Sequence, residues 1–182
     1  MSKHTLHHPE DAIAAGIGLI PEDRKQQGCF LEKPIDWNTT ISCLKALCTN
    51  GLVNKAKEEE TAVRFIERLR IKTPSRKQMA GNLSGGNQQK VVMAKTLATN
   101  SEVLIFDEPT RGIDVGAKQE IYSLMCELAE QGKAILMITS DMPELLGVSD
   151  RIIVLAHGKI TGELAKDKFS QVRVLELASK ES

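Results

Sequence analysis

An alternation of short apolar runs with an amphipathic helix is the feature that most constrains the fold of this chain. The uninterrupted apolar runs are residues 103–106 (VLIF), 134–138 (AILMI) and 152–155 (IIVL). Such runs are typical of strands that are covered on both faces. Between the first two runs, apolar residues recur at helical spacing over 115–131, at Ala117, Ile121, Leu124 and Leu128. Strand, helix, strand and helix in this order predict an α/β fold with a parallel sheet.

The chain before residue 83 has a different character. Residues 16–20 (GIGLI) form a short apolar run that stops at Pro21, which indicates one more strand. A helix is predicted over 55–70, where apolar residues form one stripe. We therefore expect a small, mainly helical subdomain over about 22–82, inserted into a sheet-containing core. The core comprises 12–21 and 83–164, with a hairpin over 151–164, and a polar, helical tail covers 165–182.

Composition excludes several classes of function. Lysine plus arginine and aspartate plus glutamate both number 24, so the formal net charge is zero and no positive field favours nucleic acid. No apolar run approaches the roughly 20 residues of a membrane-spanning helix, and the N-terminus lacks a signal-peptide core. A cytoplasmic location without direct membrane insertion is expected. The four cysteines lack CxxC spacing and are interpreted as reduced thiols, and His4, His7 and His8 as a polar terminus.

Two neighbouring carboxylates follow the first apolar run. Asp107 and Glu108 stand where a parallel sheet places its chemistry, at the carboxyl end of a strand. Asp107 is predicted to hold Mg²⁺, usually through water, and Glu108 to orient or deprotonate an attacking water. The alternative interpretation is a polar turn closed by Pro109.

A second candidate site precedes the helix predicted over 87–97. Gly85 and Gly86 let the backbone approach an anion, and the first N–H groups of a helix have no intrahelical acceptor. Ser84 adds a hydroxyl donor. Serine and glycine before a helix are also common as an ordinary cap, so this signal gains weight only beside the carboxylates.

Together these motifs carry a resemblance to a known family. LSGGNQQK at 83–90 followed by VLIFDEPTRGIDVGAK at 103–118 resembles the signature motif, Walker B strand and D-loop of an ATP-binding cassette (ABC) protein. The NQQK ending and GIGLIPEDRK at 16–25 narrow the resemblance to the second cassette of tandem-cassette subunits in bacterial ribose, galactose and xylose importers. The resemblance covers about 12–164. It implies the P-loop-NTPase-like ABC ATPase core with its helical subdomain.

The resemblance also implies roles for single residues. Leu83, Ser84, Gly85, Gly86 and Asn87 match the signature that meets the γ-phosphate of an ATP held by the opposing cassette. Asp107 matches the magnesium residue and Glu108 the catalytic glutamate. Asp114 belongs to the D-loop, Glu22 to the Q-loop, and Ser140 to the position of the switch histidine. ATP and Mg²⁺ are the implied cofactors. The implied partners are a second cassette with a Walker A motif and a sugar permease, which places the chain peripherally on the inner face of the plasma membrane.

Three residues depart from the pattern of the family. Glu22 stands in the place of glutamine, Ser140 in the place of histidine, and Asn87 in the place of the usual signature glutamine. A serine hydroxyl cannot bring a positive charge to a phosphate. Together, the departures predict slow turnover.

The largest departure is the phosphate loop, GxxxxGK followed by serine or threonine. The only Gly-Lys pairs, 132–133 and 158–159, are followed by Ala134 and Ile160, so the sequence contains no such loop. The resemblance places the strand that feeds it between the strands at 134–138 and 152–155. Without that strand, two apolar edges remain. We therefore expect the isolated chain to be marginally stable or locally rearranged, and inactive without a Walker A partner.

Two classes of function stay open on the sequence. The first is an ATP-hydrolysing component of a sugar importer, which Glu108 favours. The second is a non-catalytic remnant or regulatory module that docks on a permease or cassette, which the missing loop favours. A non-transport ATPase is disfavoured, because the sequence has neither a long coiled coil nor zinc-binding cysteines.

Overall fold

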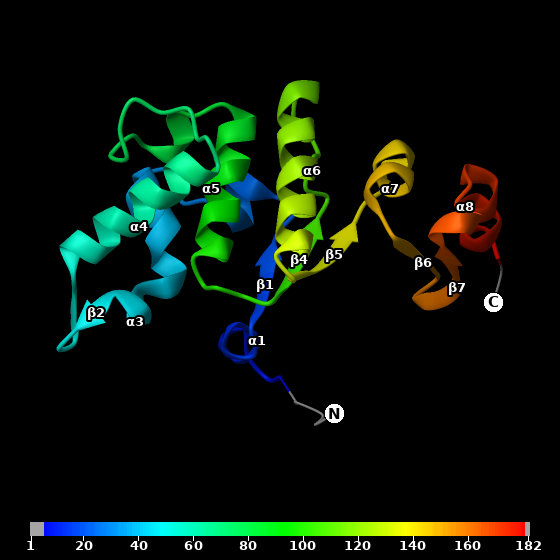
Figure 1. Cartoon of the computed structure of the whole chain (residues 1–182), viewed down its shortest axis with the longest axis horizontal. Helices are drawn as coiled ribbons and strands as arrows, with labels where there is room; N and C mark the ends of the chain where they lie inside the picture. The colour runs from blue at the N-terminus through cyan, green and yellow to red at the C-terminus, as the bar shows by residue number, and fades with distance from the viewer. Residues whose placement is uncertain (1–5, 181–182) are drawn as a thin grey trace. The chain divides into compact units, whose positions relative to one another are not determined.

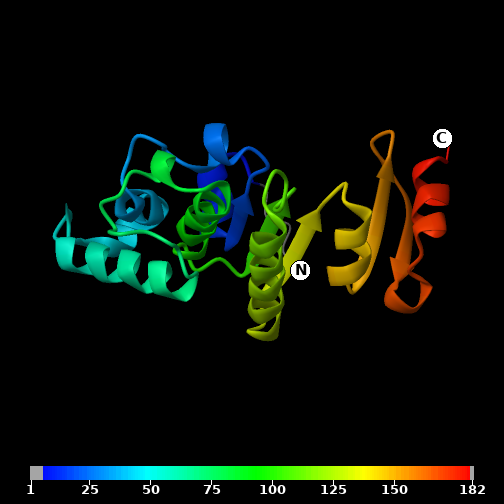
Figure 2. The ribbon, with the colours of Figure 1, turned by 90° about the horizontal axis from the view of Figure 1, so that it is seen from above.

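A computed structural model describes residues 6–180 of the chain. The fold comprises two compact units, of which the first ends at Ile138 and the second begins at Thr139. Figures 1 and 2 show the elements of both units in two views.

The first unit contains a parallel three-stranded sheet in the order β1-β4-β5. Its strands are β1 (Ile17–Ile20), β4 (Val103–Asp107) and β5 (Ala134–Ile138). β4 lies in the middle, with Val103 opposite both Ile17 and Ala134. The crossover between β4 and β5 is α6 (Val115–Glu130). The parallel α/β arrangement predicted from the sequence is thus confirmed.

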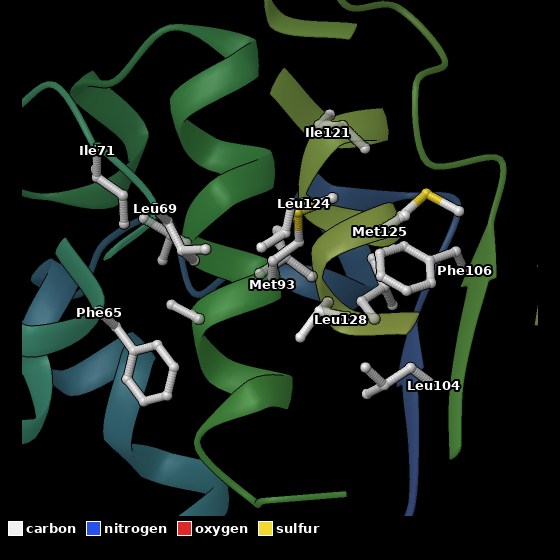
Figure 3. Packing of buried hydrophobic residues seen from close by; sticks show 14 of the residues in the cluster. Phe65, Leu69, Ile71, Met93, Leu104, Phe106, Ile121, Leu124, Met125 and Leu128 are labelled. Carbon is white, nitrogen blue, oxygen red and sulfur yellow. The ribbon is translucent and has the colours of Figure 1, made fainter. Parts of the chain in front are cut away.

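The core of the first unit forms around α5 (Gly85–Leu97). Four consecutive residues of this helix, 91–94, are fully buried, so the helix has no solvent-facing side over that turn. Figure 3 shows Met93 of α5 in one apolar cluster with Leu69 and with Leu124 of α6, and Phe106 of β4 in the same cluster. α5 also contacts β1 and the helices of the preceding segment, so it is packed on several sides.

The segment between β1 and α5 is mainly helical. Its longest helix, α4 (Lys55–Arg68), begins at the N-cap Asn54, whose side chain accepts from two backbone N–H groups. The other elements before α5 are α1 (Pro9–Ala14), the π-helical turn η1 (Arg24–Gly28), α2 (Ile35–Thr40), η2 (Ile41–Cys43), α3 (Leu44–Leu47), β2 (Cys48–Thr49), β3 (Leu52–Val53) and η3 (Ala80–Asn82).

The antiparallel pair β2-β3 was not predicted from the sequence. Asn50 and Gly51 join its strands, and both have a positive φ (52° and 80°). Asn-Gly between two strands is a strong hairpin signal, because a tight two-residue turn needs positive φ at both positions. That dipeptide could therefore have revealed the hairpin.

The second unit is built on the antiparallel hairpin of β6 (Arg151–Ala156) and β7 (Lys159–Ala165), which confirms the hairpin predicted over 151–164. His157 and Gly158 form its turn, both with positive φ. Around the hairpin lie α7 (Met142–Val148), η4 (Lys166–Lys168) and α8 (Gln171–Ala178). Its small core consists of Ile152, Val154, Leu164 and Val174.

The prediction that the apolar strands are covered on both faces is wrong for β5 and β6. In β5, Leu136 and Ile138 are 50% and 48% exposed, and in β6, Leu155 is 67% exposed. Within the described residues, β5 is an edge strand of the parallel sheet, and β6 pairs only with β7. In this chain, an apolar run therefore predicts a strand but does not predict which elements cover the faces of that strand. The expected marginal stability of the chain stays a prediction.

Gly18 in β1 offers a direct test of how closely α5 packs on the sheet. A Cβ at this position would lie 2.6 Å from Cγ2 of Thr96 and 3.1 Å from Oγ of Ser101. Thr96 cannot move freely, because its hydroxyl donates to the Leu19 carbonyl at 3.1 Å. We expect Gly18→Ala to lower the free energy of unfolding by about 1–3 kcal/mol through overpacking. Urea unfolding of the purified chain measures this change.

Gly147 in α7 provides the control for Gly18. No atom lies within 4 Å of a Cβ built on it, and its φ lies outside the positive range. Gly147→Ala is expected to be neutral or to stabilise by up to ~1 kcal/mol, because alanine is the better helix former. Equal unfolding midpoints for the two variants would contradict the packing argument.

Candidate functional site

The N-terminus of α5 presents backbone donors that no side chain caps. Ser84 is the N-cap residue, with extended φ and ψ, yet its side chain makes no capping hydrogen bond. The first intrahelical bond runs from Gln88 N–H to the Ser84 carbonyl at 2.9 Å. Within residues 6–180, the N–H groups of Gly85, Gly86 and Asn87 have no acceptor. Free N–H groups at the positive end of a helix dipole form a ready binding site for an anion.

The helix begins two residues earlier than the sequence predicted, so both glycines belong to its first turn. A Cβ on Gly86 would lie 2.8 Å from Cβ of Ala117 in α6, and a Cβ on Gly85 would lie 2.9 Å from the Arg24 guanidinium. Gly86 therefore requires glycine for its packing against α6, whereas at Gly85 the nearest atom is the far end of the flexible Arg24 side chain.

The loop between β4 and α6 lies beside these glycines. Gly112 in this loop has φ 65°, a left-handed conformation that glycine adopts without strain. Asp114 ends the loop as the N-cap of α6, and its Oδ1 accepts from Ala117 N–H at 3.0 Å. Asp114 therefore caps α6, while its role in the D-loop stays a prediction.

Arg24 joins the segment after β1 to this loop. Its Nη1 donates to the Arg111 carbonyl at 3.1 Å, and its Nη2 donates to the Gly112 carbonyl at 3.4 Å. Arg111 in turn forms an ion pair with Glu22. Glu22, the predicted Q-loop residue, therefore lies next to the predicted D-loop.

Arg24 lies within the motif GIGLIPEDRK, and the sequence predicts no role for it. Its acceptors are backbone carbonyls 87 and 88 positions further along the chain, which leave no trace in residue spacing. Only the tertiary structure reveals the link.

Asp107 and Glu108 lie at the carboxyl end of β4, as predicted for a parallel sheet. Glu108 has a left-handed φ of 44°, which is unusual for a residue with a side chain. Two hydrogen bonds hold it there: its N–H donates to the Ile138 carbonyl at 2.8 Å, and its carbonyl accepts from Arg111 N–H at 3.1 Å. The turn thus fixes the direction in which the Glu108 side chain leaves the backbone.

These carboxylates fit a magnesium ion that takes its other ligands from elsewhere. Among residues 6–180, no three histidine, cysteine, aspartate or glutamate side chains gather as a metal site. Mg²⁺ is commonly held by one or two carboxylates, with water and phosphate oxygens completing its shell. The donor set at the end of β4 therefore suits a metal that arrives with a nucleotide.

Lys90, the last residue of LSGGNQQK, anchors α5 to its neighbours. It is buried, donates from Nζ to the Arg70 carbonyl at 3.1 Å, and forms an ion pair with Glu120 of α6. The hydrogen bond from Lys90 holds the pKa of Glu120 below its usual value. The middle of α5 is thereby tied to the loop after α4 and to α6.

One predicted site residue belongs to the second unit. Ser140 lies in the second unit, directly before Asp141, the N-cap of α7. Its role in a nucleotide site therefore stays a prediction. His4 lies outside the described residues.

Comparison with a solved structure shows the fold, and a family model shows the class of protein. A nucleotide-free ATP-binding cassette from an ABC transporter matches the fold with a TM-score of 0.77, over 96% of this chain and 73% of that chain, at 22% sequence identity. The family model described as ABC transporter matches residues 3–111. The chain belongs to the ABC transporter family.

Curated relatives narrow the likeness to importers. The xylose import ATP-binding protein of Moorella thermoacetica is 49% identical over 177 residues, which cover 97% of this chain and 35% of that protein. The ribose import ATP-binding protein of Oceanobacillus iheyensis is also 49% identical over 177 residues, covering 97% of this chain and 36% of its own length. The chain thus spans about a third of the length of these relatives. Within residues 6–180, no helix is long and apolar enough to cross a membrane.

Proposed function

We propose that this chain belongs to the ATP-binding component of an ABC sugar importer and supplies the signature half of a composite ATP site. The phosphate loop of that site lies on a partner cassette. The observation that carries the proposal is the start of α5, where three consecutive N–H groups lack an acceptor in the described chain beside the exposed Ser84. This arrangement is suited to a phosphoryl oxygen. The likeness to relatives named for xylose and ribose import supports the choice of transport class.

In this proposal, Ser84, Gly85, Gly86 and Asn87 cap the nucleotide of the partner cassette. Leu83 anchors them, because its half-buried side chain packs against the core of the first unit. The rigid attachment of α5 supports this role, since an anion site gains most from donors that are oriented before the ligand arrives.

At the end of β4, Asp107 would hold Mg²⁺, and Glu108 would orient the attacking water and accept its proton. Bound MgATP supplies the γ-phosphoryl group and the charge that polarises it. The hydrogen-bonded turn at Glu108 supports this assignment, because a general base must be aimed at one place.

Glu22, Arg24 and the loop before α6 couple the site to a partner. The Glu22–Arg111 pair is solvent-exposed on both sides, with 42% and 68% of the side chains accessible. Exposed pairs typically contribute only ~0–1 kcal/mol, so this contact can break when cassettes close or a permease helix docks beside Glu22. Asp114 in the D-loop then links the two nucleotide sites across the cassette interface.

Ser140 occupies the position of the switch histidine in this proposal. It offers a neutral hydroxyl where histidine could offer a positive charge. Together with Glu22 and Asn87, it makes turnover slow. The protein works at the inner face of the plasma membrane through its permease partner.

Calorimetric titration of MgATP tests the proposal. We expect no detectable binding to the chain alone, and nucleotide-dependent association when a cassette with a phosphate loop is present. Asp107→Ala serves as the control for metal-dependent binding.

Two outcomes would change the conclusion. Binding of MgATP to the isolated chain at micromolar affinity, abolished by Asp107→Ala, would mean that the chain builds a complete site by itself. Failure of the folded chain to associate with a nucleotide-loaded cassette would leave the second function, a docking module without turnover.

A further inference from the structure

The side-chain amide of Asn87 is held at both ends. Its Oδ1 accepts from the backbone N–H of Lys72 at 2.8 Å, and its Nδ2 donates to Oγ of Ser84 at 2.9 Å. The oxygen and nitrogen of an amide are often hard to distinguish, but here the network decides. The backbone N–H of Lys72 can only donate, so the amide oxygen must face it and the nitrogen must face Ser84.

This orientation determines what the Ser84 hydroxyl can do. A hydroxyl has one hydrogen to donate and two lone pairs that accept. Because Nδ2 of Asn87 can only donate, Oγ of Ser84 accepts in this bond and keeps its own hydrogen. Ser84 does not use its side chain to cap α5, and no acceptor for its hydroxyl lies within residues 6–180. The hydrogen of the Ser84 hydroxyl is therefore available to a ligand.

From this network we infer that Asn87 is a positioning residue that turns Ser84 into a fourth donor at the start of α5. This inference rests on the proposed function, because it assumes that a phosphoryl oxygen lies there. The other three donors are the N–H groups of 85–87. Asn87 thus contributes a backbone donor directly and a hydroxyl donor through Ser84. The asparagine that departs from the usual signature glutamine has a defined role in this chain.

The hydrogen bond from Lys72 N–H fixes the orientation of the Asn87 amide. Lys72 lies in the loop after α4, 15 positions before Asn87. Its N–H prevents the amide from flipping, since a flipped amide would place two donors against each other. An oriented hydroxyl loses less freedom on binding than one that must first find its rotamer.

Three substitutions separate this role from simple packing. Asn87→Ala removes the amide from Ser84 and Lys72. Asn87→Asp keeps an acceptor for Lys72 N–H but places a second carboxylate oxygen at Ser84, which would take the hydroxyl hydrogen and repel an anion. Ser84→Ala removes the hydroxyl itself. Asn82→Ala, at an exposed position shortly before α5, is the matched control.

The first measurement uses the ligand-free chain. Two-dimensional ¹⁵N NMR follows the Asn87 side-chain amide, whose Nδ2 resonances we expect to shift when Ser84 is replaced by alanine. The same resonances should be unaffected in Asn82→Ala. An Asn87 amide that is insensitive to Ser84→Ala would overturn the inference whatever the chain binds.

The second measurement is the affinity of the chain for an ATP-loaded, hydrolysis-deficient cassette that carries a phosphate loop. Loss of a hydrogen bond to a charged group predicts a roughly 10- to 100-fold weaker association for Ser84→Ala and Asn87→Ala, and a larger loss for Asn87→Asp. In the Ser84→Ala background, Asn87→Ala should add less than about 2-fold, because both remove one donor. Independent, additive losses would overturn the inference.

The two measurements distinguish failure of the inference from failure of the proposed function. If the unmodified chain does not associate with the loaded cassette, the proposed function fails, and the ligand role of Ser84 fails with it. If association occurs but the losses of affinity caused by Ser84→Ala and Asn87→Ala are additive, the proposed function stands and the role assigned to Asn87 is wrong.

Discussion

Replacement of Glu108 by glutamine is expected to lower ATP hydrolysis about 10²- to 10⁴-fold, the range that a positioned general base contributes. Glutamine keeps the length and shape of the side chain, and the Glu108 turn is held by backbone hydrogen bonds at 2.8 and 3.1 Å that the substitution leaves in place. We therefore expect MgATP-dependent association with the partner cassette to be retained. Steady-state phosphate release by the chain paired with a phosphate-loop cassette measures the effect.

Glu102 provides a matched control for Glu108. It precedes the opposite end of β4, where its carboxylate pairs with Lys133 at 2.9 Å. Glu102→Gln removes a carboxylate beside the same strand without approaching the carboxyl end of the sheet, so the hydrolysis rate should remain within about 2-fold, in keeping with the weak energetics of exposed ion pairs. If the Glu108→Gln variant hydrolysed ATP as fast as the Glu102→Gln variant, the assignment of Glu108 as the base would be wrong.

Replacement of Asn38 by leucine is expected to lower the free energy of unfolding by about 3–5 kcal/mol, among the largest effects of a single substitution. Asn38 is fully buried in α2. Its Oδ1 accepts from Phe30 N–H at 2.8 Å, and its Nδ2 donates to the carbonyls of Phe30, Lys33 and Pro34 at 3.0–3.1 Å. One side chain thus holds the whole loop that enters α2.

The cost of losing Asn38 is uneven among these partners. The three carbonyls each keep a second donor, namely the N–H groups of Lys33, Ala80 and Asn38 itself. Phe30 N–H keeps none in the described chain, and its bond to Asn38 is partly buried. An unpaired buried donor costs about 1–3 kcal/mol, which sets the upper end for this group. The remainder comes from the three weakened carbonyl contacts.

Urea unfolding checks the prediction for Asn38. Asn38→Asp is a second informative variant, because it retains the acceptor for Phe30 N–H but turns a carboxylate oxygen toward three carbonyls. We expect it to be destabilising as well. The exposed Asn82→Ala should stay within about 0.5 kcal/mol of the unmodified chain. An unfolding midpoint for Asn38→Leu equal to that of Asn82→Ala would show that the loop does not depend on this amide.

Part of the candidate site could be predicted because its signals are local. The apolar run 103–106 and the two residues after it predicted a strand end with carboxylates, and β4 ends at Asp107. The glycines at 85 and 86 predicted a helix start with free donors, although the helix begins two residues earlier than expected. The hairpin β2-β3 was not predicted, although its signal is local too: the dipeptide Asn50–Gly51 is typical of a tight hairpin turn.

By itself, the sequence determined the α/β class, the parallel direction of the sheet, the carboxylates at the end of β4 and the resemblance to the ABC family. These follow from periodicity and short motifs, which neighbouring residues encode. Only the tertiary structure decided that Arg24 holds the loop before α6, that Lys90 ties α5 to the loop after α4 and to α6, and that the Asn87 amide bonds to Ser84 and Lys72. In each case an essential partner is a backbone group or a distant side chain. Every residue carries the same backbone donor and acceptor, so the identity of such a partner becomes visible only once the chain has folded.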